Sequence, residues 1–134
     1  MTITIHSDGA ARGNPGPAGA GAVLTAADGS IVAEVSRYLG EMTNNQAEYR
    51  ALLLAVEEAR RRGATELRIY ADSELMVRQI KGEYRVKNAE LKPLFQDVMR
   101  HLRAIGPFAI HHIPREKNKL ADKLANLAID EMRA

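Results

Sequence analysis

Apolar and polar residues alternate at the start of the chain, which is the pattern of β-strands. The stretch Ile3–His6 alternates isoleucine with polar residues, as a half-buried strand does. Two further apolar runs, at residues 18–26 and 31–39, lie on either side of Asp28-Gly29, a pair typical of tight hairpin turns. We therefore expect three consecutive strands that form an antiparallel meander.

The spacing of apolar residues becomes helical after residue 43. Thr43 and Gln46 have the spacing of a capping box, and alanine and leucine residues then recur every three or four positions to about Arg62. Three arginines, at 60–62, precede Gly63 and fit the C-terminus of this helix better than they fit a contact with nucleic acid.

The remaining residues continue to alternate between strand and helix patterns. We expect a strand at 66–71, a short helix from 73 to about 81, a connection at 82–88, a helix at 90–103, a strand at 108–113, a polar loop at 114–117 and a helix at 119–132. The inward side of this last helix is expected to consist of Leu120, Leu124, Leu127, Ala128 and Met132. The order β-β-β-α-β-α-α-β-α includes a strand-helix-strand crossover, which would set the first and fourth strands side by side and parallel.

Length and composition restrict the kinds of site that this chain can carry. With 134 residues it is expected to form one domain, residues 1–134. It contains no cysteine, so any metal must be bound by oxygen or histidine, and oxygen suits hard cations such as Mg²⁺ or Mn²⁺. The net charge of +2 permits a polyanionic partner. Neither a long apolar run nor a signal-peptide pattern is present, so we expect a cytoplasmic protein.

Four acidic residues occupy positions at which an active site can be built. Asp8 comes where the first strand is expected to stop, before a loop rich in glycine and proline, and Asp72 directly follows the fourth strand. Glu48 and Asp122 lie in the first turns of two helices, beside apolar positions. Each acid alone is explained equally well as a charge at a strand end or a helix terminus. Converging carboxylates would repel one another unless a divalent metal neutralised them, and two Mg²⁺ ions about 4 Å apart would also serve phosphodiester hydrolysis.

Four motifs, in this order, resemble type 1 ribonuclease H, the enzymes that cut RNA in RNA/DNA hybrids. The motifs are DGAARGNPGPAGAG at 8–21, TNNQAE at 43–48, YADSELMVRQI at 70–80 and REKNKLADKLA at 115–125. The resemblance covers almost the whole chain and implies an α/β fold of the ribonuclease H type, a mixed five-stranded sheet flanked by helices. It also implies that the catalytic and metal-binding acids are Asp8, Glu48, Asp72 and Asp122, with Mg²⁺ or Mn²⁺ as the cofactor.

The same resemblance places six residues against the substrate: Gly9, Asn14, Thr43, Asn44, Asn45 and Asn88. The asparagines at 14, 44 and 45 match contacts with the RNA strand, whose 2′-hydroxyls distinguish it from DNA. Thr43 and Asn88 match a pocket for a phosphate of the DNA strand. Asn14 is also explained by its turn and Thr43 by its helix cap.

The loop before the last helix departs from the pattern of many relatives, which carry a histidine there. In this chain the loop is Pro114–Lys117 and has no histidine, so Arg115 or Glu116 is a candidate for that role. Glu116 equally suits a charge at a helix N-terminus. His111 and His112 fall in the preceding strand and are expected to be structural, with one of the two facing the sheet interior.

The chain also lacks the basic helix with tryptophans that some relatives insert, and it has only GEYRVKN at 82–88. Binding of a hybrid must then depend on a modest group of cations, here termed the basic cluster: Arg78, Lys81, Arg85, Lys87 and Lys92. An ordinary solvated surface is the other explanation of these residues. Because Glu41 stands where relatives often have an arginine, we expect binding that is weak and sensitive to salt.

The sequence thus predicts a metal-dependent endoribonuclease that cuts RNA opposite DNA and, by family analogy, leaves 5′-phosphate and 3′-hydroxyl ends. The alternative is a non-catalytic module that binds RNA/DNA hybrid or double-stranded RNA on the same scaffold, against which the intact set of four acids argues. Hybrid and double-stranded RNA share A-form shape and 2′-hydroxyls, so the sequence does not rank them as substrates. A monomer is the default expectation.

Overall fold

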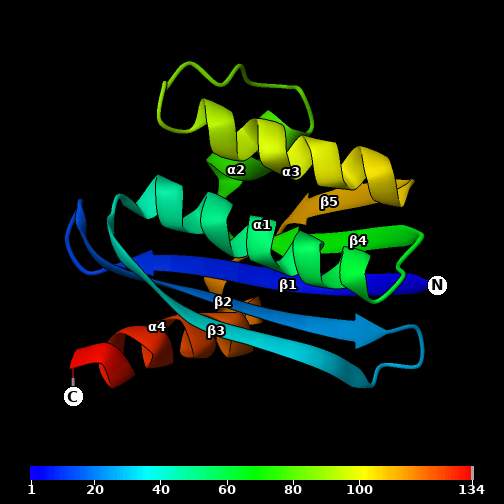
Figure 1. The fold of residues 1–134 in the computed structure, drawn as a ribbon, viewed down its shortest axis with the longest axis horizontal. Coiled ribbons are helices and arrows are strands. Elements are labelled where there is room, and N and C mark those ends of the chain that lie inside the picture. Colours follow the sequence, from blue (N-terminus) through cyan, green and yellow to red (C-terminus); the bar gives the residue numbers. More distant parts are fainter. Residues whose placement is uncertain (134) are drawn as a thin grey trace.

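The computed structural model describes residues 1–133 (Figure 1). Its strands are β1 (Thr2–Ala11), β2 (Gly16–Ala26), β3 (Ile31–Met42), β4 (Glu66–Ala71) and β5 (Phe108–His112). Its helices are α1 (Asn44–Arg61), α2 (Glu74–Ile80), α3 (Lys92–Ile105), the short 3-10 helix η1 (Arg115–Lys117) and α4 (Lys119–Arg133). The predicted order of strands and α-helices is confirmed. Within residues 1–133 no helix has the length and apolarity needed to cross a bilayer.

β1 is the central strand of a mixed five-stranded sheet with the order β3-β2-β1-β4-β5. β1, β2 and β3 pair as an antiparallel meander, whereas β4 runs parallel to β1 and β5 runs parallel to β4. Ser7 of β1 is in register with Ala71 of β4. The residues that follow these two, Asp8 and Asp72, therefore come to the same region of the sheet, as the predicted crossover requires.

Helices cover both faces of the sheet, and the main apolar core lies on one of them. α1, α2 and α3 lie on that face, and α4 packs on the opposite face against β1, β2 and β3. The buried side chains of the core include Ile3, Ile5, Leu24, Leu52, Val56, Leu67, Ile69, Val98 and Leu102. The buried Tyr49 hydroxyl of α1 donates to Gln79 Oε1 of α2 at 2.6 Å, which joins the two helices.

Both ends of α1 have the local chemistry that its sequence predicts. Thr43 is the N-cap, and the capping box with Gln46 is complete in both directions. At the other end, the side chains of Arg61 and Arg62 both contact Glu58, at 2.6 and 2.8 Å. These arginines therefore stabilise the end of the helix, which is the structural role expected of them.

Two strand predictions are wrong in detail. β1 does not stop at Asp8 but continues to Ala11, because β2 is long enough to pair with it that far. Asp8 consequently lies inside a strand. His111 and His112 are both exposed, so neither faces the sheet interior; β5 is an edge strand, and the His111 ring stacks on Tyr70 of β4.

The predicted inward side of α4 is also largely wrong. Ala128 is buried as predicted and Leu124 is half-buried, but Leu120, Leu127 and Met132 are exposed, and the other buried positions are Ala121, Ala125 and Ile129. The cause lies in β2, whose Gly19 and Gly21 have no side chains to hold the helix away. At such a short distance small alanine side chains fit against the sheet, and Leu120 and Leu127 point outwards to solvent.

Candidate active site

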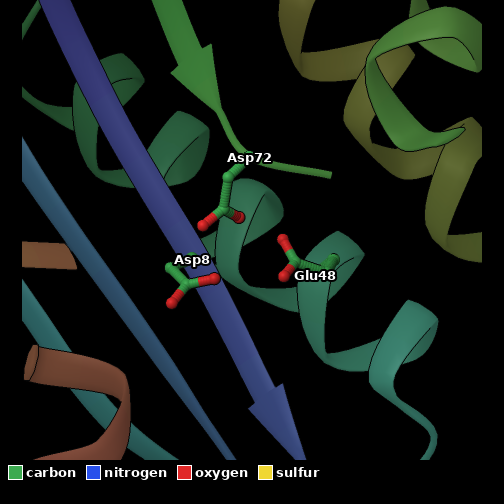
Figure 2. Close-up of side chains that lie close together, drawn as sticks. All are labelled: Asp8, Glu48 and Asp72. Carbon is green, nitrogen blue, oxygen red and sulfur yellow. The ribbon is translucent and has the colours of Figure 1, made fainter. Parts of the chain in front are cut away.

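Three of the four predicted acids converge on one point (Figure 2). Asp8 belongs to β1, Glu48 lies at the beginning of α1, and Asp72 directly follows β4. One carboxylate oxygen of each residue lies within 4.8 Å of the other two. Asp8 and Glu48 are buried and Asp72 is half-buried. We refer to these three residues as the acid cluster.

Gly9 allows α1 to approach β1 closely enough to form the cluster. A Cβ atom on Gly9 would lie 2.2 Å from the carbonyl carbon of Ala47 and 2.4 Å from the backbone nitrogen of Glu48. Any side chain at this position would push α1 away. The Gly9 N–H also lies within hydrogen-bonding reach of the Glu48 carboxylate and opposes the rise in its pKa. Gly9 thus admits the helix and orients its acid, while its contact with substrate stays a prediction.

The fourth acid, Asp122, reaches the site from the opposite face of the sheet. Gly21 is the direct partner of Asp8 across β1 and β2, and a Cβ on it would lie 2.1 Å from the carbonyl oxygen of Ala121. Gly19 makes a similar close approach to α4. The helix can therefore lie against β2, which brings the Asp122 side chain within hydrogen-bonding reach of Asp8. In the sequence these glycines resemble any small-residue run, but their spacing of two on one strand face is a sign of a closely packed helix.

The acid cluster is unfavourable when every carboxylate is ionised and no cation is present. Burial raises the pKa of Asp8 well above its usual range, and the charges of Glu48 and Asp72 raise it further. Burial and the charge of Asp72 likewise raise the pKa of Glu48. The exposed Arg115 of η1 opposes this second shift, so its guanidinium lies within electrostatic reach of the cluster. Without a cation, the cluster retains at least one proton near neutral pH.

Each acid of the cluster has a buried oxygen without a hydrogen-bond partner among residues 1–133. The three atoms are Asp8 Oδ2, Glu48 Oε2 and Asp72 Oδ2. Buried polar atoms in folded proteins are nearly always paired, so three unpaired carboxylate oxygens in one place need a partner. A hard divalent cation is the partner that carboxylate oxygens suit best. The residues present therefore fit the metal that the sequence predicts.

The residues expected to contact the RNA strand surround the beginning of α1. Asn14 Oδ1 accepts a hydrogen bond from the backbone N–H of Asn44 at 3.1 Å, which joins the loop after β1 to this helix. The side chains of Asn14, Asn44 and Asn45 are exposed. Asn14 thus has the structural role that its turn allows, and the contacts of all three side chains with RNA stay predictions.

Thr43 and Asn88, the two residues matched to a phosphate pocket, belong to one hydrogen-bonded group. Gln46, the capping partner of Thr43, donates from Nε2 to Glu90 Oε2 at 3.0 Å. The backbone N–H of Glu90 in turn donates to Asn88 Oδ1 at 2.7 Å. Two segments that are far apart in the sequence therefore meet, as a shared pocket requires.

The loop before α4 forms η1, which the sequence did not predict as a helix. Arg115 and Glu116, the two candidates to replace the histidine of relatives, are both exposed there. Of these two, Arg115 is the one whose charge acts on Glu48. A cation within electrostatic reach of Glu48 is suited to offset the negative charge of a phosphate bound at the acid cluster.

Arg78 differs from the rest of the basic cluster because two acids neutralise it. Its Nη2 lies 3.2 Å from Glu74 Oε2, and its Nη1 lies 3.2 Å from Glu83 Oε1. The guanidinium also lies over the ring of Tyr84. The other members are exposed and form no ion pair within the described part of the chain: Lys81, Arg85, Lys87 and Lys92. The unpaired positive charge of the basic cluster therefore lies in residues 81–92.

The sheet order, the helices on its two faces and the carboxylates beside β1 and β4 define a domain of the ribonuclease H-like class. Residues 6–128 match the family described as reverse transcriptase-like. The chain belongs to this family, as a type 1 ribonuclease H domain.

Curated relatives and solved structures support this assignment. A ribonuclease HI of Halobacterium salinarum is 42% identical over 96% of this chain and 65% of its own length. A bifunctional protein of Mycobacterium tuberculosis is 41% identical over 97% of this chain, which spans 36% of that protein. A ribonuclease H of Chromohalobacter salexigens is 35% identical over 98% of this chain and 87% of its own length. This chain thus spans about one to two thirds of the length of the first two relatives.

Two solved structures show how closely the folds agree. The crystal structure of RNase H1 from Halobacterium salinarum has a TM-score of 0.94 at 40% identity and covers 98% of this chain and 99% of its own. The structure of LC11-RNase H1 in complex with an RNA/DNA hybrid has a TM-score of 0.94 at 44% identity and covers 98% and 99% of the two chains. The predicted ribonuclease H fold is therefore confirmed.

Proposed function

We propose that this chain is a metal-dependent endoribonuclease that hydrolyses the RNA strand of RNA/DNA hybrids and leaves 5′-phosphate and 3′-hydroxyl ends. In this proposal residues 1–134 act as a single catalytic domain. The observation that carries it is the convergence of Asp8, Glu48 and Asp72, each with an unpartnered buried oxygen. The family relationship supports the same reaction, and the similar LC11-RNase H1 was solved with an RNA/DNA hybrid.

Asp8, Glu48 and Asp72 would hold the metal, with Asp122 beside Asp8 as the fourth acid. A pair of Mg²⁺ ions, or Mn²⁺ in their place, when bound supplies an activated water and stabilises the leaving oxygen of a phosphodiester. Because the carboxylates have raised pKa values, protons must leave the cluster before a cation is held there. Metal affinity is therefore expected to increase with pH.

Recognition of the hybrid in this proposal divides between the two strands. The exposed amides of Asn14, Asn44 and Asn45 offer donors and acceptors to 2′-hydroxyls, which only the RNA strand carries. Thr43 and Asn88 face a phosphate of the DNA strand, and the unpaired cations of residues 81–92 add attraction to its backbone. Arg115 offsets charge near the scissile phosphate.

The test compares RNA/DNA hybrid, RNA duplex and DNA duplex, each incubated with Mg²⁺, Mn²⁺ or EDTA. Wild type is expected to cut the RNA strand of the hybrid with either metal and to cut nothing in EDTA, and the new ends are assigned by phosphatase and ligase treatment. Asp8→Asn is expected to bind the hybrid and to cleave it at least about 100-fold more slowly.

The matched control is Asp97→Asn, an exposed acid of α3 that pairs with Arg100. It is expected to cleave at the wild-type rate. Binding of the hybrid by wild type without metal-dependent cutting would contradict the proposal and favour the non-catalytic module.

A further inference from the structure

The loop between β1 and β2 contacts the two helices that carry acids of the site, α1 with Glu48 and α4 with Asp122. On one side Asn14 accepts from the first residue of α1. On the other side Arg12 reaches α4, where Nη1 lies 2.6 Å from Asp130 Oδ1 and Nη2 lies 3.2 Å from Asn126 Oδ1 and 3.4 Å from the Asn126 carbonyl oxygen. The loop thus connects the helix of Glu48 with the helix of Asp122.

The contact between Arg12 and Asn126 fixes the orientation of an amide group. A guanidinium can only donate, so the atom of Asn126 that faces it must be the oxygen Oδ1. The Nδ2 atom must then point the other way along the helix. There it donates to the Asp122 carbonyl at 3.0 Å and to Asp122 Oδ1 at 3.3 Å. Arg12 therefore determines that Asn126 presents a donor, and not an acceptor, to the Asp122 carboxylate.

The stability of the Arg12–Asp130 ion pair does not explain this arrangement. The two side chains are 34% and 61% exposed, and ion pairs between side chains that water reaches contribute little to stability. The half-buried Asp122, by contrast, lies at the acid cluster, within hydrogen-bonding reach of Asp8. A carboxylate at a metal site depends on outer hydrogen bonds for its orientation.

We propose that Arg12 and Asn126 are positioning residues that hold the Asp122 carboxylate at the acid cluster. Arg12 orients the Asn126 amide, and the amide orients the carboxylate. This inference rests on the proposed function, because it assigns to Asp122 a part in holding the metal and in cleavage.

The test measures kcat and KM for cleavage of an RNA/DNA hybrid, and Mn²⁺ affinity by calorimetry without nucleic acid. Arg12→Ala and Asn126→Ala are each expected to lower kcat and weaken Mn²⁺ binding by about tenfold, with KM for the hybrid unchanged. The double variant is expected to lose no more than Asn126→Ala alone, since Arg12 acts through Asn126. Asn126→Asp, which faces Asp122 with a second carboxylate, is expected to lose more than Asn126→Ala.

Two controls separate positioning from the loss of charge or of an ion pair. Arg100→Ala removes an exposed arginine of another ion pair, and Asp130→Asn removes the ion pair of Arg12 while the contact with Asn126 stays. Both are expected to keep wild-type kcat and Mn²⁺ affinity. Thermal unfolding shows whether each variant is folded. If Arg12→Ala is unstable, Arg12→Lys takes its place. Lysine keeps one donor, so this variant is expected to recover part of the kcat and the Mn²⁺ affinity.

The outcomes distinguish this inference from the function on which it rests. If wild type shows no metal-dependent cleavage, the proposed function itself is wrong. If wild type cleaves and Asp122→Asn is impaired, but Arg12→Ala and Asn126→Ala keep the kcat and Mn²⁺ affinity of Arg100→Ala, the positioning role is overturned and the proposed function stands. Losses that simply add in the double variant would also overturn it.

Discussion

Asp8 and Gly21 are directly opposed across β1 and β2, and the bare backbone of Gly21 is what allows α4 to lie beside the acid. A Cβ on Gly21 would lie 2.1 Å from the carbonyl oxygen of Ala121 and 2.5 Å from the backbone nitrogen of Ala125. Backbone atoms cannot rotate out of the way as a flexible side chain can, so the helix itself would have to move. The position of Asp122 relative to Asp8 therefore depends on a residue without a side chain.

Gly21→Ala is expected to displace α4, to lower the free energy of unfolding by about 1–3 kcal/mol and to slow cleavage. Urea unfolding followed by circular dichroism and single-turnover cleavage measure the two effects. The control is Gly29→Ala in the β2–β3 turn, where φ is +88° and nothing lies within 4 Å. It strains the backbone by about 1–2 kcal/mol but is expected to leave cleavage unchanged. If Gly21→Ala kept the stability and activity of wild type, α4 would not lie directly against the backbone of Gly21.

Asp8→Asn is expected to stabilise the metal-free protein while it abolishes cleavage. The substitution removes a buried carboxyl group whose pKa is raised by burial and by Glu48 and Asp72, so the folded protein no longer has to hold a proton or a charge there. Removal of this cost should add about 1–2 kcal/mol at pH 8, which thermal unfolding in EDTA measures. Asp97→Asn, at an exposed position on α3, should give no such gain. A lower melting temperature for Asp8→Asn than for wild type would contradict the repulsion.

The stability of the metal-free protein should also depend on pH through the same cluster. The pKa values of Asp8 and Glu48 are higher in the folded state than in the unfolded chain, so the folded state binds protons more tightly. This contribution is complete below the unfolded carboxyl pKa of about 4 and is lost as the pH rises towards the folded values. The measured quantity is the unfolding free energy of wild type minus that of Asp8→Asn.

In EDTA this difference is expected to fall from about pH 4 towards the folded-state pKa of Asp8, about 10, and in saturating Mg²⁺ the fall should be much smaller. Other carboxylates, such as Glu58 with its lowered pKa, contribute equally to both proteins and cancel in the difference. A difference that stays constant with pH in EDTA would mean that Asp8 ionises normally.

The sequence predicts well those parts of this fold that depend on local chemistry. The capping box of Thr43 and Gln46 sets the start of α1, and the turn at Asp28-Gly29 sets the β2–β3 hairpin. The convergence of Asp8 with Asp72 follows from the crossover that makes β1 and β4 parallel neighbours. These features need only a few consecutive residues or one general rule of topology.

The features that sequence reasoning missed depend on contacts between distant segments. β1 extends past Asp8 because β2 offers a pairing partner that far, and nothing in the period of β1 indicates this. Leucine periodicity in α4 indicates the wrong face, because the glycines of β2 select small side chains for the contact. The pair of Arg78 with Glu83 likewise depends on how the loop after α2 folds back, whereas its pair with Glu74 is an i,i+4 contact within α2.

Tyr49→Phe tests the link between α1 and α2. It removes the hydroxyl that donates to Gln79 Oε1, and Gln79 is only 5% exposed, so its oxygen would stay buried and unpaired. The free energy of unfolding is expected to fall by about 1–3 kcal/mol, measured by urea unfolding. Tyr84→Phe, at an exposed position, is the matched control and should hardly change the free energy of unfolding. Equal stability of the two variants would indicate that another group satisfies Gln79.

Salt dependence should identify the cations that contact the hybrid. Affinity is measured by fluorescence anisotropy between about 50 and 200 mM salt, with Asp8→Asn as the background so that the RNA stays intact. Lys87→Ala is expected to reduce the slope of log affinity against log salt by about 1, since Lys87 is exposed and unpaired among the described residues. Affinity that does not change with salt would exclude the phosphate contacts altogether.

Glu83→Gln should have the opposite effect from Lys87→Ala. It frees the guanidinium of Arg78 from one of its two acids and removes a negative charge from the loop that follows α2, so the hybrid should bind more tightly and with a steeper salt slope. Glu58→Gln is the matched control, because it frees Arg61 and Arg62 at the far end of α1. If Glu58→Gln tightened binding as much as Glu83→Gln does, the arginines at the end of α1 would be part of the binding surface and attraction would not be confined to residues 81–92.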